Sequence, residues 1–179
     1  GRLGELISGP NSNSYVKLRW ADDGRESSWM KLHSLDGEPL KLPLQSPFEG
    51  EHLDLAHQQL DPGHIVILAW WLTTEFSGAV ARLVLSGNKI TGTTDDTSGF
   101  KALCEAATAV VELKLDNCGL GDAAIAALAP LISSSVSVLS SLDVSKNNLG
   151  RRSARLLLQA VKSDGCTLVA CKLDNSGID

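Results

Sequence analysis

One eight-residue pattern occurs five times in this chain of 179 residues, and it constrains the fold more than any other feature. Each copy has apolar residues at its first, third and eighth positions and small or polar residues at its fifth to seventh positions. The copies begin 30, 30, 29 and 29 residues apart. A unit of this length, repeated in register, predicts a solenoid in which each coil packs on its neighbours. The copies lie at residues 53–60, 83–90, 113–120, 142–149 and 171–178.

Each copy predicts a short parallel strand and a turn, followed by a helix whose apolar residues recur at three- and four-residue steps. In the first repeat, Asp61 followed by Pro62 predicts the start of the helix, with Asp61 as the cap. In the second repeat a longer loop precedes a helix that begins near Ser98. The expected inward residues are Ile65, Leu68 and Leu72; Phe100, Leu103, Cys104 and Ala107; Ile125, Leu128 and Ile132; and Ala154, Leu157 and Val161.

The sixth position of the copies carries Gln58, Asn88, Cys118, Asn147 and Ser176. A short polar side chain in a tight turn can bond backbone groups that would otherwise lack a partner. We therefore expect a ladder of side chains that joins neighbouring coils, with Cys118 as its weakest member.

These features resemble the leucine-rich repeat family, specifically the long-repeat class typified by ribonuclease inhibitor. The resemblance covers residues 52–179 and rests on the five copies. It implies an α/β horseshoe with parallel strands on the concave face and helices on the convex face. It also implies that the chain binds other proteins. A regulator that activates a small GTPase belongs to the same class, but no local motif singles out that activity here.

Residues 1–34 have a different period. Short β-prone runs at 3–8, 15–20 and 27–32 are separated by turn-forming residues, which predicts a small antiparallel meander. The turn Trp20-Ala-Asp-Asp-Gly24 followed by Ser27-Ser-Trp29 resembles an SH3-like or Tudor-like module. Trp20 and Trp29 would form an aromatic pocket for a methylated lysine or a proline-rich peptide, or would fill a small core. Residues 35–51, with three prolines, are expected to be a linker, in which Leu40–Leu44 is a candidate edge strand.

The first helix has more apolar surface than one buried face requires, because Val66, Ile67, Trp70 and Trp71 lie outside the predicted inward set. A first repeat has no preceding coil to cover it. We interpret Val66, Trp70 and Trp71 as a docking surface for the N-terminal segment, with an external partner as the alternative.

The outward-facing strand residues are expected to form columns about 4.8 Å apart across the coils. This concave face is mixed in charge and poor in aromatic residues, so its partner should be a modestly polar protein. Lys114, Asp143 and Lys172 alternate in sign and are expected to pair laterally. The alternative is that the face is solvated and that the ends or the helices bind. The candidate residues are His52, Asp54, Arg82, Val84, Glu112, Lys114, Asp116, Asp143 and Lys172.

Several chemistries are disfavoured. A net charge of -5 with interspersed signs argues against nucleic acid or an anionic membrane as the partner. The longest apolar run, 65–72, is shorter than the roughly 20 residues that a membrane span needs. The glycine pair Gly119 and Gly121 follows a strand as in a dinucleotide fingerprint, but other repeats fill the same slot without it. His52, Asp54 and His57 lack a fourth ligand for a metal. No catalytic residue, cofactor or metal is therefore predicted.

The four cysteines, at 104, 118, 166 and 171, fall where other repeats carry Leu, Ala or Asn, which favours free thiols in the cytoplasm or another reducing compartment. The chain starts at Gly1 and stops one residue after the fifth copy, so we expect it to be a piece of a longer polypeptide. The predicted function is a non-catalytic protein-interaction scaffold that belongs to a larger assembly. The alternatives are a stoichiometric regulator of an enzyme, such as a GTPase activator or an inhibitor, and a peptide reader that uses the N-terminal module.

Overall fold

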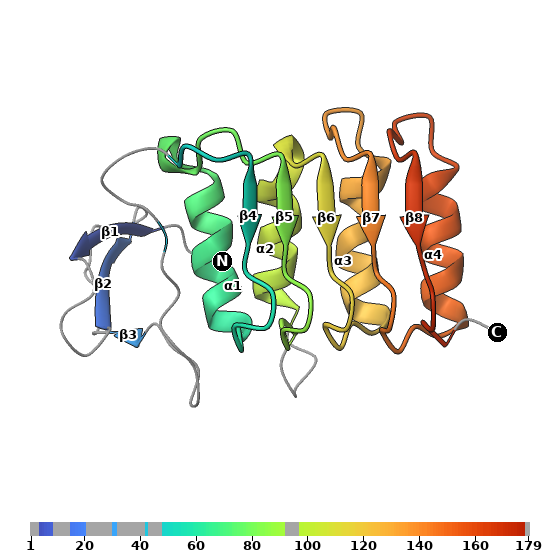
Figure 1. The fold of residues 1–179 in the computed structure, drawn as a ribbon, viewed down its shortest axis with the longest axis horizontal. Helices are drawn as coiled ribbons and strands as arrows, with labels where there is room; N and C mark the ends of the chain where they lie inside the picture. Colours follow the sequence, from blue (N-terminus) through green and yellow to red (C-terminus); the bar gives the residue numbers. More distant parts are fainter. Residues whose placement is uncertain are drawn as a thin grey trace.

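The computed structural model describes residues 4–8, 15–20, 30–31, 42, 48–91 and 97–177, and for the first three of these ranges it describes the backbone alone. This part of the chain has a mixed α/β architecture with a five-stranded parallel sheet and four α-helices. The helices lie side by side behind the sheet, in sequence order (Figure 1). The predicted α/β class is confirmed.

Strands and helices alternate from His52 onward. The strands are β4 (His52–Asp54), β5 (Arg82–Val84), β6 (Glu112–Lys114), β7 (Ser141–Asp143) and β8 (Ala170–Lys172). The helices are α1 (Pro62–Leu72), α2 (Ser98–Ala106), α3 (Asp122–Ser133) and α4 (Arg151–Val161), with short 3-10 turns η1 (Glu75–Ser77) and η2 (Ala107–Ala109) after the first two. Nearer the N-terminus, β1 (Gly4–Ser8), β2 (Tyr15–Trp20) and β3 (Met30–Lys31) pair antiparallel in that order.

The parallel sheet has the order β4-β5-β6-β7-β8, and its register places equivalent motif positions opposite each other. Leu53 lies opposite Leu83, and Leu83 lies opposite Leu113. Backbone hydrogen bonds continue beyond the three-residue strands, as between the Leu55 N–H and the Val84 carbonyl at 2.9 Å. The expectation that the five motif strands build one parallel sheet in sequence order is confirmed.

The motif's apolar positions build the core. At the third position, Leu55, Leu85, Leu115 and Val144 are at most 4% exposed. Burying one such side chain contributes about 1.5–3 kcal/mol. The fifth copy departs from the prediction, because Leu173 is 38% exposed. β8 is the last strand of the described sheet, so no coil of the described chain covers Leu173 on its outer side.

The helices bury the faces that the sequence predicts, with exceptions at the two ends. Every predicted inward residue of the second and third repeats is buried, whereas Leu72 in the first repeat is only half-buried. In α4, Leu157 is buried but Val161 is 42% exposed. Ala154 is half-buried as well. The equivalent Ile125 and Ile132 lie on α3, which packs against both α2 and α4, whereas no described helix follows α4.

The expected ladder of sixth-position side chains is present. The Asn88 Oδ1 accepts the Leu60 N–H at 3.0 Å, and its Nδ2 donates to the carbonyls of Leu55 and Leu85, both at 2.8 Å. Asn147 bonds the third coil in the same way. Each asparagine therefore holds the turn of the coil before its own. Gln58 is exposed, because no coil precedes its own in the described sheet.

The turn before each ladder residue has a left-handed backbone, which the sequence analysis did not anticipate. The fifth motif position has a positive φ in all five coils, and Gly87 and the asparagines there suit that conformation. His57 and Lys146 adopt the same left-handed conformation, each with a φ of 56°, although their side chains favour it less than glycine or asparagine. The five residues are His57, Gly87, Asn117, Lys146 and Asn175.

Helix α1 begins where the sequence predicts. The Asp61 Oδ1 accepts the His64 N–H at 3.0 Å, and the same oxygen lies 2.7 Å from the His64 Nδ1. Burial alone would raise the pKa of Asp61, but these bonds from His64 hold it below its ordinary value. The ionised form therefore caps the helix at neutral pH.

Candidate functional site

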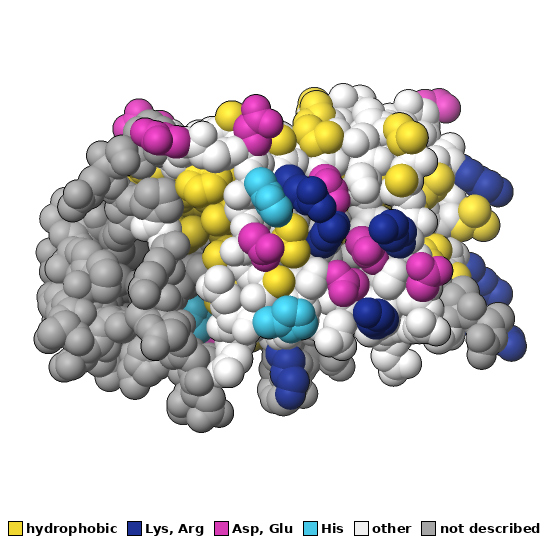
Figure 2. Space-filling view, viewed as in Figure 1, with side chains coloured by type: hydrophobic (Ala, Val, Ile, Leu, Met, Phe, Trp, Pro, Cys, Tyr) yellow, Lys and Arg dark blue, Asp and Glu magenta, His cyan; other side chains and the backbone are white. Residues whose placement is uncertain are grey.

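The outward side chains of β4–β8 form the candidate site, here called the strand face. The register places His52, Arg82, Glu112, Ser141 and Ala170 in one column and Asp54, Val84, Lys114, Asp143 and Lys172 in the next. Figure 2, drawn from the same side as Figure 1, shows basic, acidic and histidine side chains interleaved over the strands. The structure thus brings the predicted concave-face residues onto one surface.

Glu112 is the centre of the charge pattern on the strand face. Its Oε1 lies 3.2 Å from the Arg82 Nη2 and 3.6 Å from the Lys114 Nζ. All three side chains are 29–40% exposed, so each pair contributes at most about 1 kcal/mol. The two contacts fix the positions of a glutamate and two cations in the middle of the face.

The expected lateral pairing of Lys114, Asp143 and Lys172 differs from the geometry found. Lys114 pairs with Glu112, two residues back on its own strand. The Asp143 Oδ1 instead accepts the Ser145 N–H at 3.0 Å, and the Asp54 Oδ1 accepts the Ala56 N–H at 2.9 Å. An aspartate at the second motif position therefore closes the turn after its strand, because its side chain is short enough to reach the backbone two residues on.

Val84 is not available to a partner, contrary to its prediction as a binding residue. It is only 7% exposed. Its neighbours Asp54 and Lys114 lie directly beside it on β4 and β6, at the close spacing of paired strands. A branched side chain between two longer ones loses most of its surface.

Asp116 belongs to a third column, two residues after the second, and its carboxylate is hydrogen-bonded by the neighbouring repeat. This column contains Ala56, Ser86, Asp116, Ser145 and Asp174. The Ser86 hydroxyl donates to the Asp116 Oδ1, and in the same column the Ser145 Oγ accepts the Asp174 N–H at 3.2 Å. In each of these two neighbouring pairs a serine hydroxyl thus bonds the aspartate of the next repeat, through its carboxylate or its backbone. Asp116 is half-buried and presents only part of its carboxylate to solvent.

The predicted docking surface on α1 divides into a buried and an exposed part. Trp71 is fully buried, and its ring meets that of Phe48 edge-on with centroids 6.2 Å apart. Trp70 is half-buried and Val66 is 46% exposed. Trp71 was predicted to dock the N-terminal segment, and it does contact Phe48 of that segment while being fully buried in the core. The ring that meets it does belong to the segment before the first repeat.

The segment from Phe48 to Gly50 is fixed to the coil of α1 by its backbone as well. The Phe48 N–H donates to the Phe76 carbonyl at 2.9 Å. Gly78 has a φ of 59°, and a Cβ there would stand 2.3 Å from the Phe48 carbonyl oxygen. Only glycine permits this approach.

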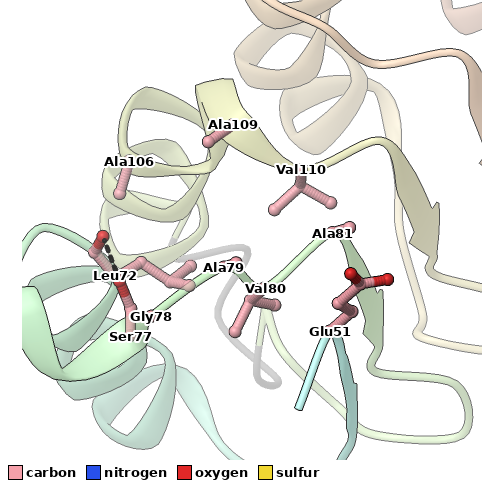
Figure 3. A pocket seen from close by; sticks show the side chains of 10 residues that line it. All are labelled: Glu51, Leu72, Ser77, Gly78, Ala79, Val80, Ala81, Ala106, Ala109 and Val110. Carbon is pink, nitrogen blue, oxygen red and sulfur yellow. Dashed lines mark hydrogen bonds between the residues drawn. The ribbon is translucent and has the colours of Figure 1, made fainter. Parts of the chain in front are cut away.

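A pocket that the sequence analysis missed opens at the edge of the sheet where the strands begin, between the ends of α1 and α2. It has a volume of about 380 Å³. Figure 3 shows Glu51 and Ala81 on one side of this rim pocket and Leu72 and Ser77 on the other. The run of small residues before β5 and β6 was its only signal in the sequence. The lining residues are Glu51, Leu72, Ser77, Gly78, Ala79, Val80, Ala81, Ala106, Ala109 and Val110.

The thiols are poorly placed for chemistry. Burial, with a smaller effect of the Glu105 carboxylate, raises the pKa of Cys104 to about 12. Burial also raises the pKa of Cys118 to about 12, and the pKa of the exposed Cys171 is raised too, mainly by partial burial. A thiol reacts as its thiolate, so these pKa values suppress nucleophilic attack near pH 7.

Other candidate chemistry is weak in the described ranges. No group of three or more His, Cys, Asp or Glu side chains there has a geometry that would hold a metal ion. The Asp122 of the glycine-pair segment accepts hydrogen bonds from the backbone and hydroxyl of Ser153, which ties α3 to α4. Trp29 lies outside the described residues, as does the side chain of Trp20, so the aromatic pocket stays a prediction.

No protein-family model matches the chain, and no curated protein matches its sequence. Within the residues that the structure describes, no helix is both long enough and apolar enough to cross a membrane.

Proposed function

We propose that this chain is a non-catalytic protein-binding module, built as a solenoid of the leucine-rich repeat type and engaged through the strand face. The observation that carries the proposal is a parallel sheet whose outward charges of both signs stand in columns set by its register. The Arg82–Glu112–Lys114 cluster at its centre is partly exposed and already oriented by its ion pairs. Oriented charges of both signs favour selection of a partner and a binding register more than raw affinity.

The same observation disfavours other partners. A nucleic acid would require a surface of one positive sign. Here Glu112 and Asp143 stand among the cations. Glu112 pairs with both Arg82 and Lys114, so the positive charge of the face is partly neutralised. A partner protein of mixed charge meets this pattern without leaving a buried charge unpaired.

Affinity capture with a charge-matched control tests the proposal. The strand-face double variant His52→Glu/Lys172→Glu changes two exposed residues at opposite ends of the sheet. The control Gln159→Glu/Lys162→Glu makes the same change in net charge on two exposed residues, one in α4 and one at its C-cap. Proteins captured by the wild type and by the control, and lost with the strand-face variant, support the proposal. Loss with the control alone refutes it.

The alternative of a GTPase regulator is distinguished from a scaffold by whether capture of the partner depends on the bound nucleotide. Capture is repeated with GDP and with a non-hydrolysable GTP analogue. A partner held in only one nucleotide state identifies a GTPase regulator, whereas a partner held equally in both identifies a resident scaffold.

Two further parts of the proposal rest on the N-terminal strands and the cysteines. β1–β3 are proposed to belong to a small SH3-like or Tudor-like module over residues 1–34, joined to the repeats by residues 35–51. Its peptide-reading role is tested by titrating indole NMR signals of Trp20 and Trp29 with methyl-lysine and proline-rich peptides. Cys104, Cys118, Cys166 and Cys171 are free thiols, which fits a reducing compartment.

A further inference from the structure

The rim pocket has walls that suit a hydrocarbon chain. Ala79, Ala81, Ala106 and Ala109 line it with single methyl groups, and Leu72 and Val80 complete its apolar surface. Its volume of about 380 Å³ lies at the low end of the range for ligand sites, which is enough for one long side chain.

The charge of the pocket has one sign. Glu51 is the sole charged residue that lines it, and its side chain is exposed. Among the described residues Glu51 has no ion pair, and the neighbouring Arg82 is turned to Glu112 instead. Glu49 and Glu75 are also exposed and unpaired within the described ranges, and they lie two residues from the lining residues Glu51 and Ser77 in the chain. Glu51 therefore gives the pocket lining a negative charge, which attracts a cation.

The pocket continues into an apolar edge. Val111, Val136, Val138 and Val169 are 40–88% exposed and precede β6, β7 and β8. Backbone hydrogen bonds tie each repeat of this edge to the one before it. The Val111 N–H donates to the Ala81 carbonyl, and the Val138 N–H donates to the Thr108 carbonyl. Figure 2 shows hydrophobic side chains along this upper edge. Four large apolar residues exposed along one edge are typical of an interaction surface.

We propose that this edge binds an extended segment of a partner protein, with apolar side chains along the valines and one basic side chain in the rim pocket. The aliphatic stem of a lysine or arginine lies on the alanines, and its cationic head faces the Glu51 carboxylate. The site is separate from the strand face, because its residues precede the strands instead of projecting from them. It goes beyond the proposed function by adding a second surface with its own specificity.

The test uses the full chain with 13C-labelled alanine and valine methyl groups and the peptide acetyl-Val-Thr-Arg-Thr-Val-amide, in which both valines lie on the same face as the arginine when the peptide is extended. We expect saturable shifts at Ala79, Ala81, Ala106, Ala109 and Val111. The same peptide with citrulline, which is neutral and nearly isosteric with arginine, should bind about three- to five-fold more weakly, as expected for one exposed charge pair. A lysine peptide of the same sequence distinguishes the two cations.

Two variants complete the test. Glu51→Gln should weaken the arginine peptide about three- to five-fold and abolish its preference over citrulline. The matched control Glu105→Gln, on the exposed side of α2, should change neither value. Ala109→Leu fills the pocket and should remove binding of both peptides. The proposal is overturned by the absence of saturable shifts up to 10 mM peptide (roughly the weakest affinity of interest), by equal binding of the citrulline peptide, or by an unaffected Glu51→Gln.

Discussion

Asn147 makes more hydrogen bonds than any other side chain of the described ladder, and its replacement by alanine gives the sharpest test of the fold. The side chain is 3% exposed. Its Oδ1 accepts the N–H groups of Cys118 at 2.9 Å and Leu120 at 3.0 Å. Its Nδ2 donates to the carbonyls of Leu115 at 2.9 Å and Val144 at 2.8 Å. All four partners are backbone groups of buried turns.

The expected loss follows from the groups left without partners. A buried N–H that loses its acceptor costs about 1–3 kcal/mol. Two such groups give about 2–6 kcal/mol, before any contribution from the carbonyls, which can accept elsewhere. We therefore expect Asn147→Ala to lower the free energy of unfolding by about 4 kcal/mol, a large part of the roughly 5–15 kcal/mol typical of a domain.

Urea unfolding measures the change, and hydrogen exchange locates it. The amides of Cys118 and Leu120 should exchange faster in Asn147→Ala, while those of the first coil should change little, because each coil contacts only its neighbours. Asn148→Ala is the control, since Asn148 is the next residue and exposed, and its change should stay within about 0.5 kcal/mol. Equal destabilisation by the two substitutions would refute the account of the ladder.

Three further predictions follow from the same contacts. Cys118→Asn should raise the free energy of unfolding by about 1 kcal/mol, since the Cys118 thiol makes only weak sulfur hydrogen bonds, at 3.2 Å to the Leu85 carbonyl and 3.5 Å to the Asp116 carbonyl, where an asparagine would bond more strongly; a lower free energy of unfolding in urea contradicts this. Trp71→Ala should cost about 3–5 kcal/mol and expose the Phe48 segment to limited proteolysis, whereas Trp70→Ala should cost less. A thiol reagent at pH 8 should label Cys171 in the native protein and leave Cys104 and Cys118 unlabelled. Folding raises the pKa of both buried thiols from 9.0 to about 12, so the free energy of unfolding should fall as the pH rises from 9 towards 12. A free energy of unfolding that increases over that range would contradict the assignment.

The repeat itself was predictable because its signal is periodic. The register of the sheet, the buried third positions and the asparagine ladder follow from five aligned copies, in which each position has the same neighbours above and below. The cap at Asp61 was readable because Asp before Pro at a helix start is a local signal that needs no tertiary context.

The departures occur where neighbours differ from coil to coil. Val161 has the same helical offset as Ile132, yet it is exposed because nothing described packs against it. Trp71 was predicted to contact the N-terminal segment, but the repeat pattern could not identify Phe48 as the residue that meets it. The rim pocket arises from small residues in the loops before two strands, and the size of such a gap depends on how adjacent coils pack. None of these is encoded in the motif.

The structure also narrows which charges of the strand face can select a partner. Asp54 and Asp143 each use one carboxylate oxygen to accept a backbone N–H of the turn that follows, and Glu112 pairs with two cations. Lys172 is exposed at the outer end of the column, with no ion pair among the described residues. A charge that already has a protein partner gains little from a second one, whereas an unpaired charge gains the whole interaction. The discriminating contacts should therefore lie towards β8, with the Arg82–Glu112–Lys114 cluster setting the register of the partner instead of its affinity.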